Sequence, residues 1–287
     1  MAYNTENRDE SSSRLLSEER LQKNITLRVA AQINEGVSRL QEATDNGPRM
    51  NHQAIIELDH LLLSDFTTIK EQEGIVKQAR SNDVLSISQG LYIPYETLLE
   101  EAFVRQILQS PNITNHLDGS NVTANYLNRY FNLAANEVRL AGINKDDKVL
   151  FLGSGPFPIT AIEYARQTGC QVDCVEHYDE KAETSRKVIR QLGYEDQIRV
   201  HTAEGQSFDP SWHSVILVGV LAQPKQDIFN NLDANCKDGD STRILARTTK
   251  GLRQFIYPPA KFQTTRFSFQ GINTATHDQA LSTILLR

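Results

Sequence analysis

The sequence predicts an α/β fold in which an α-helical N-terminal domain precedes a Rossmann-like parallel sheet domain. Two observations carry this prediction. In the first half of the chain, apolar residues recur at intervals of three and four, which is typical of amphipathic helices. In the second half, short apolar runs alternate with helical patterns, and such alternation builds a parallel sheet with right-handed crossovers.

The predicted domain boundaries divide the chain into three parts. Residues 1–14 are rich in Ser, Asn and Glu and are expected to be disordered. Residues 15–143 form the helical domain, and residues 144–287 form the sheet domain. Within the helical domain we expect helices over 15–40, 54–70 and 95–108, and a loop containing Pro, Asn and Gly over 110–120.

The composition excludes several classes of function. The 287 residues carry a net charge of −6 without a basic run, which argues against a nucleic-acid partner. No apolar stretch is long enough for a membrane span, and the polar start is not a signal sequence, so a cytoplasmic enzyme is expected. The three cysteines and seven histidines lack ligand spacing, so no metal site is expected.

The run VLFLGSGPFPIT over residues 149–160 predicts a cofactor loop. A buried strand leads into the turn Gly153-Ser154-Gly155, and a helix follows from about residue 159. Glycines let the backbone approach a ligand, although a purely structural turn would have the same pattern. Pro156 and Pro158 remove N–H donors, and Pro158 occupies the place of a third glycine. A ligand without phosphates, such as S-adenosylmethionine, therefore suits the loop better than a dinucleotide does.

The strands downstream of the loop extend the predicted cofactor site. The strand over 172–175 ends on Glu176, whose carboxylate can accept from both ribose hydroxyls, although a solvent-facing acid is the alternative. A third strand over 198–200 precedes Glu204, where an adenine contact is expected. The apolar run VILVGVL over 215–221 predicts a fourth strand, buried on both faces, that brings Val220 to the cofactor.

Two clusters of polar residues are candidates for substrate binding. Glu96 and Glu100 are four residues apart on one predicted helix, beside Tyr92, and form either an acidic pocket wall or a solvated helix face. Arg247 and its neighbours follow the predicted strand at 244–245. They either grip a carboxylate or belong to a solvated loop.

Several motifs resemble those of the nicotianamine synthase family. RTTKGLRQFIYPP is similar to the family signature Arg-Ser/Thr-Ala-x-Gly-x-Arg-x-x-Leu-Tyr-Pro, and GSGPFPIT resembles its GSGPLPLT loop. VILVGVL resembles its VFLAALVG strand, ETLLEEAF its EGLLExHF/Y helix, and YFNLAANE its Tyr-x-Asn-Leu-x-x-x-Glu segment, while STILLR is similar to SVIIAR. The resemblance runs from about residue 96 to residue 287.

The resemblance implies an enzyme that uses S-adenosylmethionine as co-substrate and needs no metal. Members of the family transfer its 3-amino-3-carboxypropyl (aminobutyrate) group to an amine and release 5′-methylthioadenosine. Plant members condense three S-adenosylmethionines, whereas bacterial relatives that make opine-type metallophores transfer once to histidine. This chain departs from the family pattern at Tyr95-Glu96, Ala102-Phe103 and Asn125-Tyr126-Leu127, where the acceptor should bind, and the departures favour histidine.

The resemblance also implies roles for individual residues. The expected catalytic residues are Glu100 as base, Glu96 as its partner, and Tyr126. The expected cofactor-binding residues are Gly153, Ser154, Gly155, Pro156, Glu176, Glu204 and Val220. The expected substrate-binding residues are Tyr92, Tyr130, Arg247, Arg253 and Tyr257. An opine dehydrogenase is the expected pathway partner, and a homodimer is considered. The alternatives are condensation of S-adenosylmethionine units, an ordinary methyltransferase, or a non-catalytic metal- or metabolite-binding module.

Overall fold

The structure is a computed structural model that describes residues 6–45, 51–63, 67–109, 121–236, 242–277 and 279–287. Within these ranges, the side chains of residues 6–18, 43–45, 51–52 and 121–126 are not described. The loop predicted over 110–120 and the side chain of Tyr126 therefore lie outside the described part of the chain.

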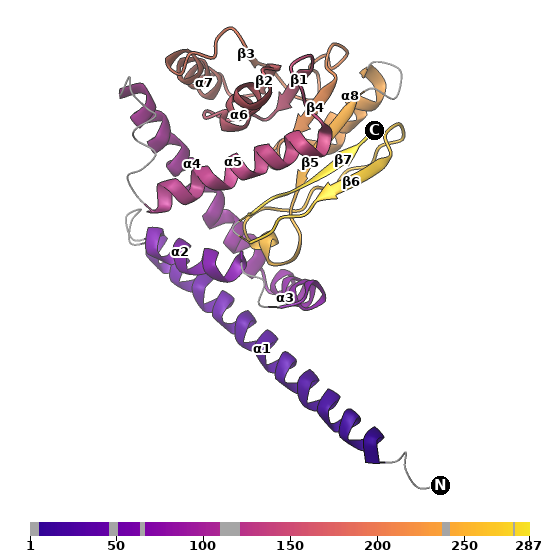
Figure 1. Cartoon of the computed structure of the whole chain (residues 1–287). Helices are drawn as coiled ribbons and strands as arrows, with labels where there is room; N and C mark the ends of the chain where they lie inside the picture. Colours follow the sequence, from indigo (N-terminus) through magenta and orange to yellow (C-terminus); the bar gives the residue numbers. More distant parts are fainter. Residues whose placement is uncertain (1–5, 46–50, 64–66, 110–120, 237–241, 278) are drawn as a thin grey trace.

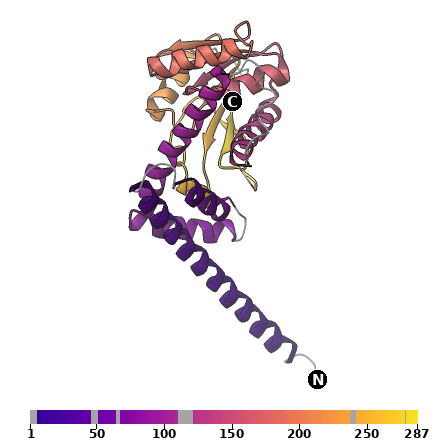
Figure 2. The same cartoon turned by 90° about the vertical axis from the view of Figure 1, so that its left-hand side faces the viewer.

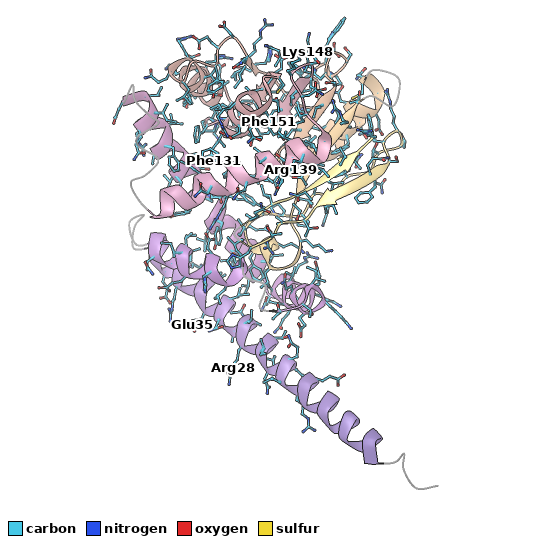
Figure 3. The ribbon with its side chains drawn as sticks, viewed as in Figure 1. Arg28, Glu35, Phe131, Arg139, Lys148 and Phe151 are labelled. Carbon is cyan, nitrogen blue, oxygen red and sulfur yellow. The ribbon has the colours of Figure 1, made fainter. Side chains whose placement is uncertain are left out.

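Helices form the N-terminal half, as the apolar spacing predicts. They are α1 (Glu6–Asp45), α2 (Asn51–Leu62), α3 (Ile69–Ser81), α4 (Val84–Gln109) and α5 (Asn121–Ala141). Helix α1 projects away from the rest of the molecule, and α2 lies along its C-terminal half (Figures 1 and 2). Arg28 and Glu35 of α1 are exposed to solvent (Figure 3).

The helix bounds differ from the prediction at several ends, and α4 begins at Val84 instead of residue 95. Helix α1 begins at Glu6, inside the segment predicted to be disordered. The single helix predicted over 54–70 is interrupted, since α2 ends at Leu62 and α3 begins at Ile69. Thr68 ends the connection with a capping box, because its side chain accepts from the N–H of Glu71 while the Glu71 carboxylate accepts from the N–H of Thr68.

A mixed sheet forms the C-terminal half and confirms the predicted α/β class. Its strands are β1 (Lys148–Leu152), β2 (Gln171–Glu176), β3 (Ile198–Thr202), β4 (Val215–Val218), β5 (Arg243–Thr248), β6 (Phe269–Asn273) and β7 (Ser282–Leu286), in the order β3-β2-β1-β4-β5-β7-β6. The first five are parallel, whereas β7 pairs antiparallel with β5 and β6 antiparallel with β7. The connecting helices are α6 (Ile159–Thr168), α7 (Asp179–Gln191) and α8 (Lys225–Asn235), and a short 3₁₀ helix, η2, spans Gly251–Phe255.

Alternating side chains of the strands face two different cores. Val149 and Phe151 of β1 face the core shared with α4, α5, α6 and α7, whereas Leu150 and Leu152 face the core shared with α8. In Figure 1, α4 and α5 lie between the lower helices and the sheet. Phe103 of α4 and Ala134 of α5 are buried in the same core as β1. The last two N-terminal helices are thus packed directly on the sheet domain.

The fourth strand is shorter than the sequence predicts. β4 ends at Val218, so Val220 and Leu221 lie in the loop that follows. The next residue is Gly219, whose N–H donates to the carbonyl oxygen of Leu152 at 3.0 Å. A Cβ at Gly219 would lie 3.0 Å from the carbonyl oxygen of Gly153, so the two chain segments approach closely where β4 ends.

Candidate active site

A cavity of about 680 Å³ opens at the carboxyl ends of β1, β2 and β4. Strand order reverses between β1 and β4, which is where open α/β sheets bind ligands. Loops from the sheet form one wall, and α4, α5 and the segment after η2 form the other. Twelve predicted site residues line the cavity together: Glu96, Glu100, Tyr130, Gly153, Ser154, Gly155, Pro156, Glu176, Glu204, Val220, Arg247 and Tyr257.

The glycine turn after β1 is part of the sheet-side wall of the cavity. Gly153 has φ +78° and Gly155 has φ +72°, a left-handed conformation that strongly favours glycine. The N–H of Gly155 donates to Glu176 Oε2 at 3.0 Å, and the N–H of Tyr178 donates to Glu176 Oε1 at 3.0 Å. The carboxylate is therefore held against the turn. Each of its oxygens keeps a further lone pair for a ligand hydroxyl.

Two carboxyl groups of α4 face this turn from the helical wall. A Cβ built on Gly155 would lie 3.7 Å from Glu100 Oε2, so Glu100 reaches the cofactor loop. Glu96 lies one turn earlier in α4 and is only partly exposed. Burial, and next the charge of Glu100, raise the pKa of Glu96 to about 8, although the nearby Arg129 guanidinium lowers it. Near neutral pH, Glu96 is thus largely a neutral carboxylic acid.

Two tyrosines bring hydroxyl groups to the same wall. Tyr130 of α5 and Tyr257, which follows η2, have their hydroxyl oxygens 3.4 Å apart. Thr249 fixes the second of them, because its hydroxyl donates to the carbonyl oxygen of Tyr257 at 2.8 Å. The pair supplies donors and acceptors close to the two carboxyl groups of α4.

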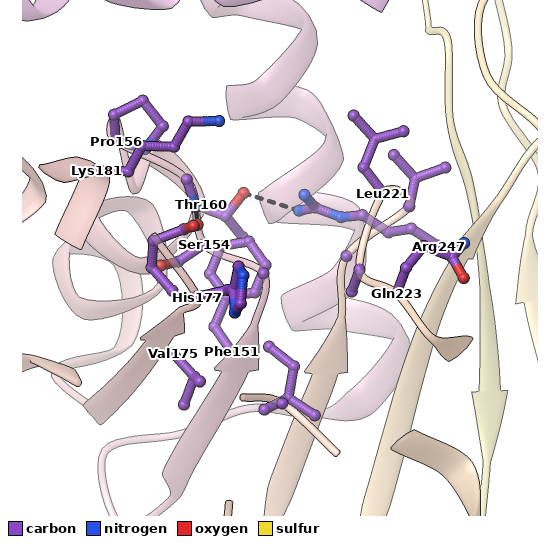
Figure 4. Close-up of a pocket in the computed structure, with 18 of the residues that line it drawn as sticks. Phe151, Ser154, Pro156, Thr160, Val175, His177, Lys181, Leu221, Gln223 and Arg247 are labelled. Atoms are coloured by element: carbon purple, nitrogen blue, oxygen red, sulfur yellow. Dashed lines mark hydrogen bonds between the residues drawn. The ribbon is translucent and has the colours of Figure 1, made fainter. Parts of the chain in front are cut away.

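The rim of the cavity contains residues that the sequence analysis missed. Glu204 Oε1 lies 2.6 Å from His177 Nδ1, and Tyr178 is 59% exposed with Lys181 Nζ 5.1 Å from its ring centroid. His177 and Lys181 are drawn in Figure 4 beside the turn. His177 and Tyr178 directly follow Glu176 in the sequence, and Lys181 lies in the first turn of α7, so their position after the strand-end acid is the available signal.

Arg247 lines the cavity, but its guanidinium group is already bound inside the protein. Its Nε and Nη2 donate to the two oxygens of Glu137, each at 2.8 Å, and Nη2 also donates to Thr160 Oγ1 at 2.8 Å (Figure 4). Glu137 is fully buried and also accepts from Tyr164 and Thr283. The guanidinium edge formed by Nε and Nη2 therefore binds Glu137, and this ion pair ties β5 to α5. Contact of Arg247 with a substrate carboxylate remains a prediction.

Two further predicted substrate-binding residues lie away from the described lining of the cavity. Arg253 is buried and donates to the carbonyl oxygens of Gln279 at 2.6 Å and Thr276 at 2.9 Å, so it braces the segment before β7. Tyr92 is 2% exposed, and its hydroxyl donates to Asp59 Oδ1 at 2.9 Å. Both side chains are structural for the same reason, since their polar groups bind other parts of the chain.

The described residues offer neither a metal site nor a membrane-spanning helix. Among them, no three His, Cys, Asp or Glu side chains are grouped so that they can hold a metal ion. No helix in the same part of the chain has the length and apolarity needed to cross a membrane.

The fold and the cavity define a class of protein. A glycine turn at the end of β1, an acid at the end of β2 and a deep cavity at the switch point are the features of a Rossmann-like cofactor-binding enzyme. The family described as nicotianamine synthase protein matches residues 22–286. The chain belongs to the nicotianamine synthase family, which confirms the resemblance seen in its motifs.

Two similar proteins come from bacteria. An L-histidine 2-aminobutanoyltransferase of Yersinia pestis is 26% identical over 174 residues, which are 56% of this chain and 64% of that protein. An enzyme of the same name from Pseudomonas aeruginosa is 25% identical over 157 residues, 53% of this chain and 59% of that protein. The matches thus span about three fifths of the length of these relatives.

Solved structures of MtNAS share the fold over most of both chains. A glutamate-to-glutamine mutant of MtNAS in complex with S-adenosylmethionine has a TM-score of 0.78 and 25% identity, covering 90% of this chain and 96% of that one. MtNAS in complex with MTA and tNA has a TM-score of 0.77 and 26% identity, covering 89% and 96%. The N-terminal helices and the C-terminal sheet of this chain are therefore matched together in MtNAS.

Proposed function

We propose that this protein transfers the 3-amino-3-carboxypropyl (aminobutyrate) group of S-adenosylmethionine to the amine of histidine and releases 5′-methylthioadenosine, in the biosynthesis of an opine-type metallophore. The observation that carries the proposal is the position of Glu100, whose carboxylate lies next to the glycine turn of a cofactor cavity. The names of the bacterial relatives and the S-adenosylmethionine complex of MtNAS support it.

The sheet-side wall suits S-adenosylmethionine. A volume of about 680 Å³ is in the range of small-molecule sites, and the left-handed turn at Gly153 and Gly155 leaves the backbone open to a ligand. In the proposed complex, Glu176 accepts from the ribose hydroxyls, and Glu204 and Val220 lie around the adenine. The positive sulfonium then faces the carboxyl groups of α4, which stabilise it.

The proposed reaction is a single displacement at carbon. The neutral amine of the acceptor attacks the γ-carbon of the aminobutyrate group, and a nitrogen–carbon bond forms. The carbon–sulfur bond breaks, and its electron pair goes to sulfur, which becomes the neutral thioether of 5′-methylthioadenosine. Holding the amine in line with this bond, away from water, supplies much of the rate enhancement.

Glu100 is the proposed base of this step. An acceptor amine is protonated near neutral pH and is a nucleophile only after it loses that proton, which Glu100 accepts. Glu96 orients the amine from one turn away, and its acid form can donate a hydrogen bond. In the proposed complex, Tyr130 and Tyr257 lie beside the acceptor. Tyr126 of α5 is a third tyrosine proposed to hydrogen-bond the reacting groups.

The setting of the reaction is also part of the proposal. We expect the protein to act in the cytoplasm, where S-adenosylmethionine is made, and to pass its product to an opine dehydrogenase, which consumes an amino acid with a free α-amine. A homodimer is the assembly that we would test first, by light scattering.

One alternative has a specific observation in its favour. The MtNAS complex with MTA and tNA has the same fold as this chain, so condensation of S-adenosylmethionine units is the second candidate function. It differs from the first candidate in the acceptor and not in the reacting bond. An ordinary methyltransferase would instead release S-adenosylhomocysteine.

The products of one incubation distinguish these functions. The purified protein is incubated with carboxyl-labelled S-adenosylmethionine and either L- or D-histidine, and the products are identified by mass. We expect label in a histidine adduct together with 5′-methylthioadenosine. Label that appears only in nicotianamine would exclude histidine as the acceptor, and S-adenosylhomocysteine would exclude aminobutyrate transfer.

A further inference from the structure

A second, small cavity of about 20 Å³ lies behind Glu96. Glu96, Tyr130 and Leu281 line both this cavity and the main one, so the two are neighbours. Arg129 and Gln279 line only the small one. This volume holds about one water-sized group, which means that a small polar end of a ligand fits there and a ring does not.

The small cavity carries N–H donors and positive charge. Arg129 Nη2 lies 2.6 Å from Asp59 Oδ2, and the guanidinium group has further N–H donors beyond this bond. Asp59 also accepts from the buried Tyr92 hydroxyl at 2.9 Å, so it holds the guanidinium in a fixed position. Gln279 accepts from the N–H of Thr276 through its amide oxygen, at 3.1 Å, a bond that does not use its amide nitrogen. A fixed guanidinium beside an amide is a recognition site for a carboxylate.

We propose that Arg129 binds the α-carboxylate of the acceptor amino acid in this small cavity and so restricts the reaction to acceptors with a carboxylate next to the amine. The inference rests on the proposed function and identifies the group of the acceptor that the site recognises. One carbon separates the two groups of an α-amino acid. A carboxylate at Arg129 therefore places the amine beside Glu96 and Tyr130, where the two cavities meet and where Glu100 can take its proton.

The charges around the small cavity are compatible with a carboxylate. Glu96 has a pKa raised to about 8, so near neutral pH it is mostly uncharged and does not repel the ligand. Of the other two acids near Glu96, Asp59 binds one edge of the Arg129 guanidinium, and Glu100 lines the main cavity and not the small one. In the proposed complex, the carboxylate accepts from N–H groups of Arg129 that do not bind Asp59.

Two acceptors that differ only in this group test the proposal. Release of 5′-methylthioadenosine is measured with L-histidine and with histamine, which lacks the carboxylate. We expect the wild type to prefer histidine, in kcat/KM, by about 10- to 100-fold, the range of a charge-assisted hydrogen bond. Arg129→Gln should lower kcat/KM for histidine by a similar factor, through KM, and leave the values for histamine and the Kd for S-adenosylmethionine within about twofold.

The controls separate binding from folding. Arg139→Gln removes an exposed arginine of the same helix and should leave every parameter unchanged. If Arg129→Gln alone does not fold, the double variant Asp59→Asn/Arg129→Gln removes both charges and takes the same test. Thermal unfolding is recorded for each variant.

Three outcomes would overturn the proposal. The first is a wild type that uses histamine as well as histidine, and the second is an Arg129→Gln variant with an unchanged KM for histidine. The third is an Arg129→Gln variant whose main loss is in S-adenosylmethionine binding, since the carboxylate bound would then be that of the co-substrate. A wild type that makes no histidine adduct and binds no histidine by calorimetry overturns the proposed function itself, which separates the two failures.

Discussion

The two walls of the cavity differ in how their charged groups are satisfied. On the sheet side, the Glu176 carboxylate accepts from two backbone N–H groups, and Arg247 of β5 is held by the buried Glu137, which reaches it from α5. On the helical side, Glu96 and Glu100 lie one turn apart, and burial with this repulsion raises the pKa of Glu96. The carboxylate of the sheet-side wall is thus fixed by hydrogen bonds, whereas the two carboxyl groups of the helical wall repel each other when both are ionised, which costs stability.

In the proposed reaction, this difference assigns a different task to each wall. A ligand that must be held in one orientation needs donors and acceptors that are already in place, as at the glycine turn. A proton transfer needs a group whose protonation changes near the working pH, as on α4. The variants below test this division, ordered from the largest expected effect to the smallest.

The largest effect is expected for Glu100→Gln on the helical wall. Loss of the base should lower turnover by about 10²- to 10⁴-fold and leave the Kd for S-adenosylmethionine unchanged, because the amide cannot accept the amine proton. Turnover is followed by 5′-methylthioadenosine release and binding by calorimetry. Glu101→Gln, at the adjacent exposed position, is the matched control. Turnover within threefold of the wild type would move the base to another residue.

The next effect concerns the scaffold behind the sheet-side wall. Arg247→Met leaves the fully buried Glu137 without its counter-charge. We expect the free energy of unfolding to fall by about 3–5 kcal/mol, the usual cost of breaking a buried ion pair. Urea denaturation measures it. Arg166→Met breaks an ion pair in which the arginine is 57% exposed and should cost less than about 1 kcal/mol. Equal losses in the two variants would mean that the buried pair is not special.

Much of the sheet wall is predictable from the sequence, and much of the helical wall is not. The run over 149–160 and the acid at 176 follow local rules, since a turn needs glycine and a strand of this type ends at the ligand. Glu96 and Glu100 become a site only through the family motif, because paired glutamates also occur on solvated helices. Arg129 donates a hydrogen bond to Asp59, which is 70 residues away in the sequence, so no local sequence pattern predicts this contact.

The differences between prediction and structure have a common physical cause. The sequence predicts that Arg247 and Arg253 bind a substrate because they follow a predicted strand and match the family signature, whereas the structure shows both guanidinium groups bound to other parts of the chain. Their partners, Glu137 and the carbonyl oxygens of Thr276 and Gln279, come from distant segments. The end of β4 was misplaced because Gly219 looks like any other residue of an apolar run until the neighbouring strand is in position.

Glu176→Gln tests whether the sheet wall binds the co-substrate. The neutral amide weakens the bonds from the N–H groups of Gly155 and Tyr178 and removes the charge from the ribose contact. We expect the Kd for S-adenosylmethionine to rise by about 10- to 100-fold, with a smaller change in turnover at saturation. Isothermal calorimetry gives the Kd. Glu183→Gln, at an exposed position of α7, should bind as the wild type does. A changed KM for histidine alone would contradict the division of tasks.

The smallest effect is a change in the pH dependence of stability. The pKa of Glu96 rises from its usual 4.5 to about 8 on folding, so the folded state binds more protons than the unfolded state between these values. Stability should therefore decrease as the pH rises through this window. Because the carboxyl group is partly exposed, we expect Glu96→Gln to recover about 1–2 kcal/mol at pH 8.5 and little at pH 4. Urea denaturation at both pH values checks it, and an unchanged slope would show that Glu96 is normally ionised.

The contact between the loops after β1 and β4 limits how the cavity can be redesigned. A Cβ at Gly153 would lie 3.0 Å from the Cβ of Ala222, and Gly219 is equally close to the carbonyl oxygens of Leu152 and Gly153. A larger side chain at either glycine would push the two loops apart. We expect this change to weaken the binding of S-adenosylmethionine itself, whichever analogue is offered. Leu221 is 45% exposed and lines the same cavity. An engineer who wants the enzyme to accept a bulkier analogue of S-adenosylmethionine should trim Leu221 first and leave both glycines intact.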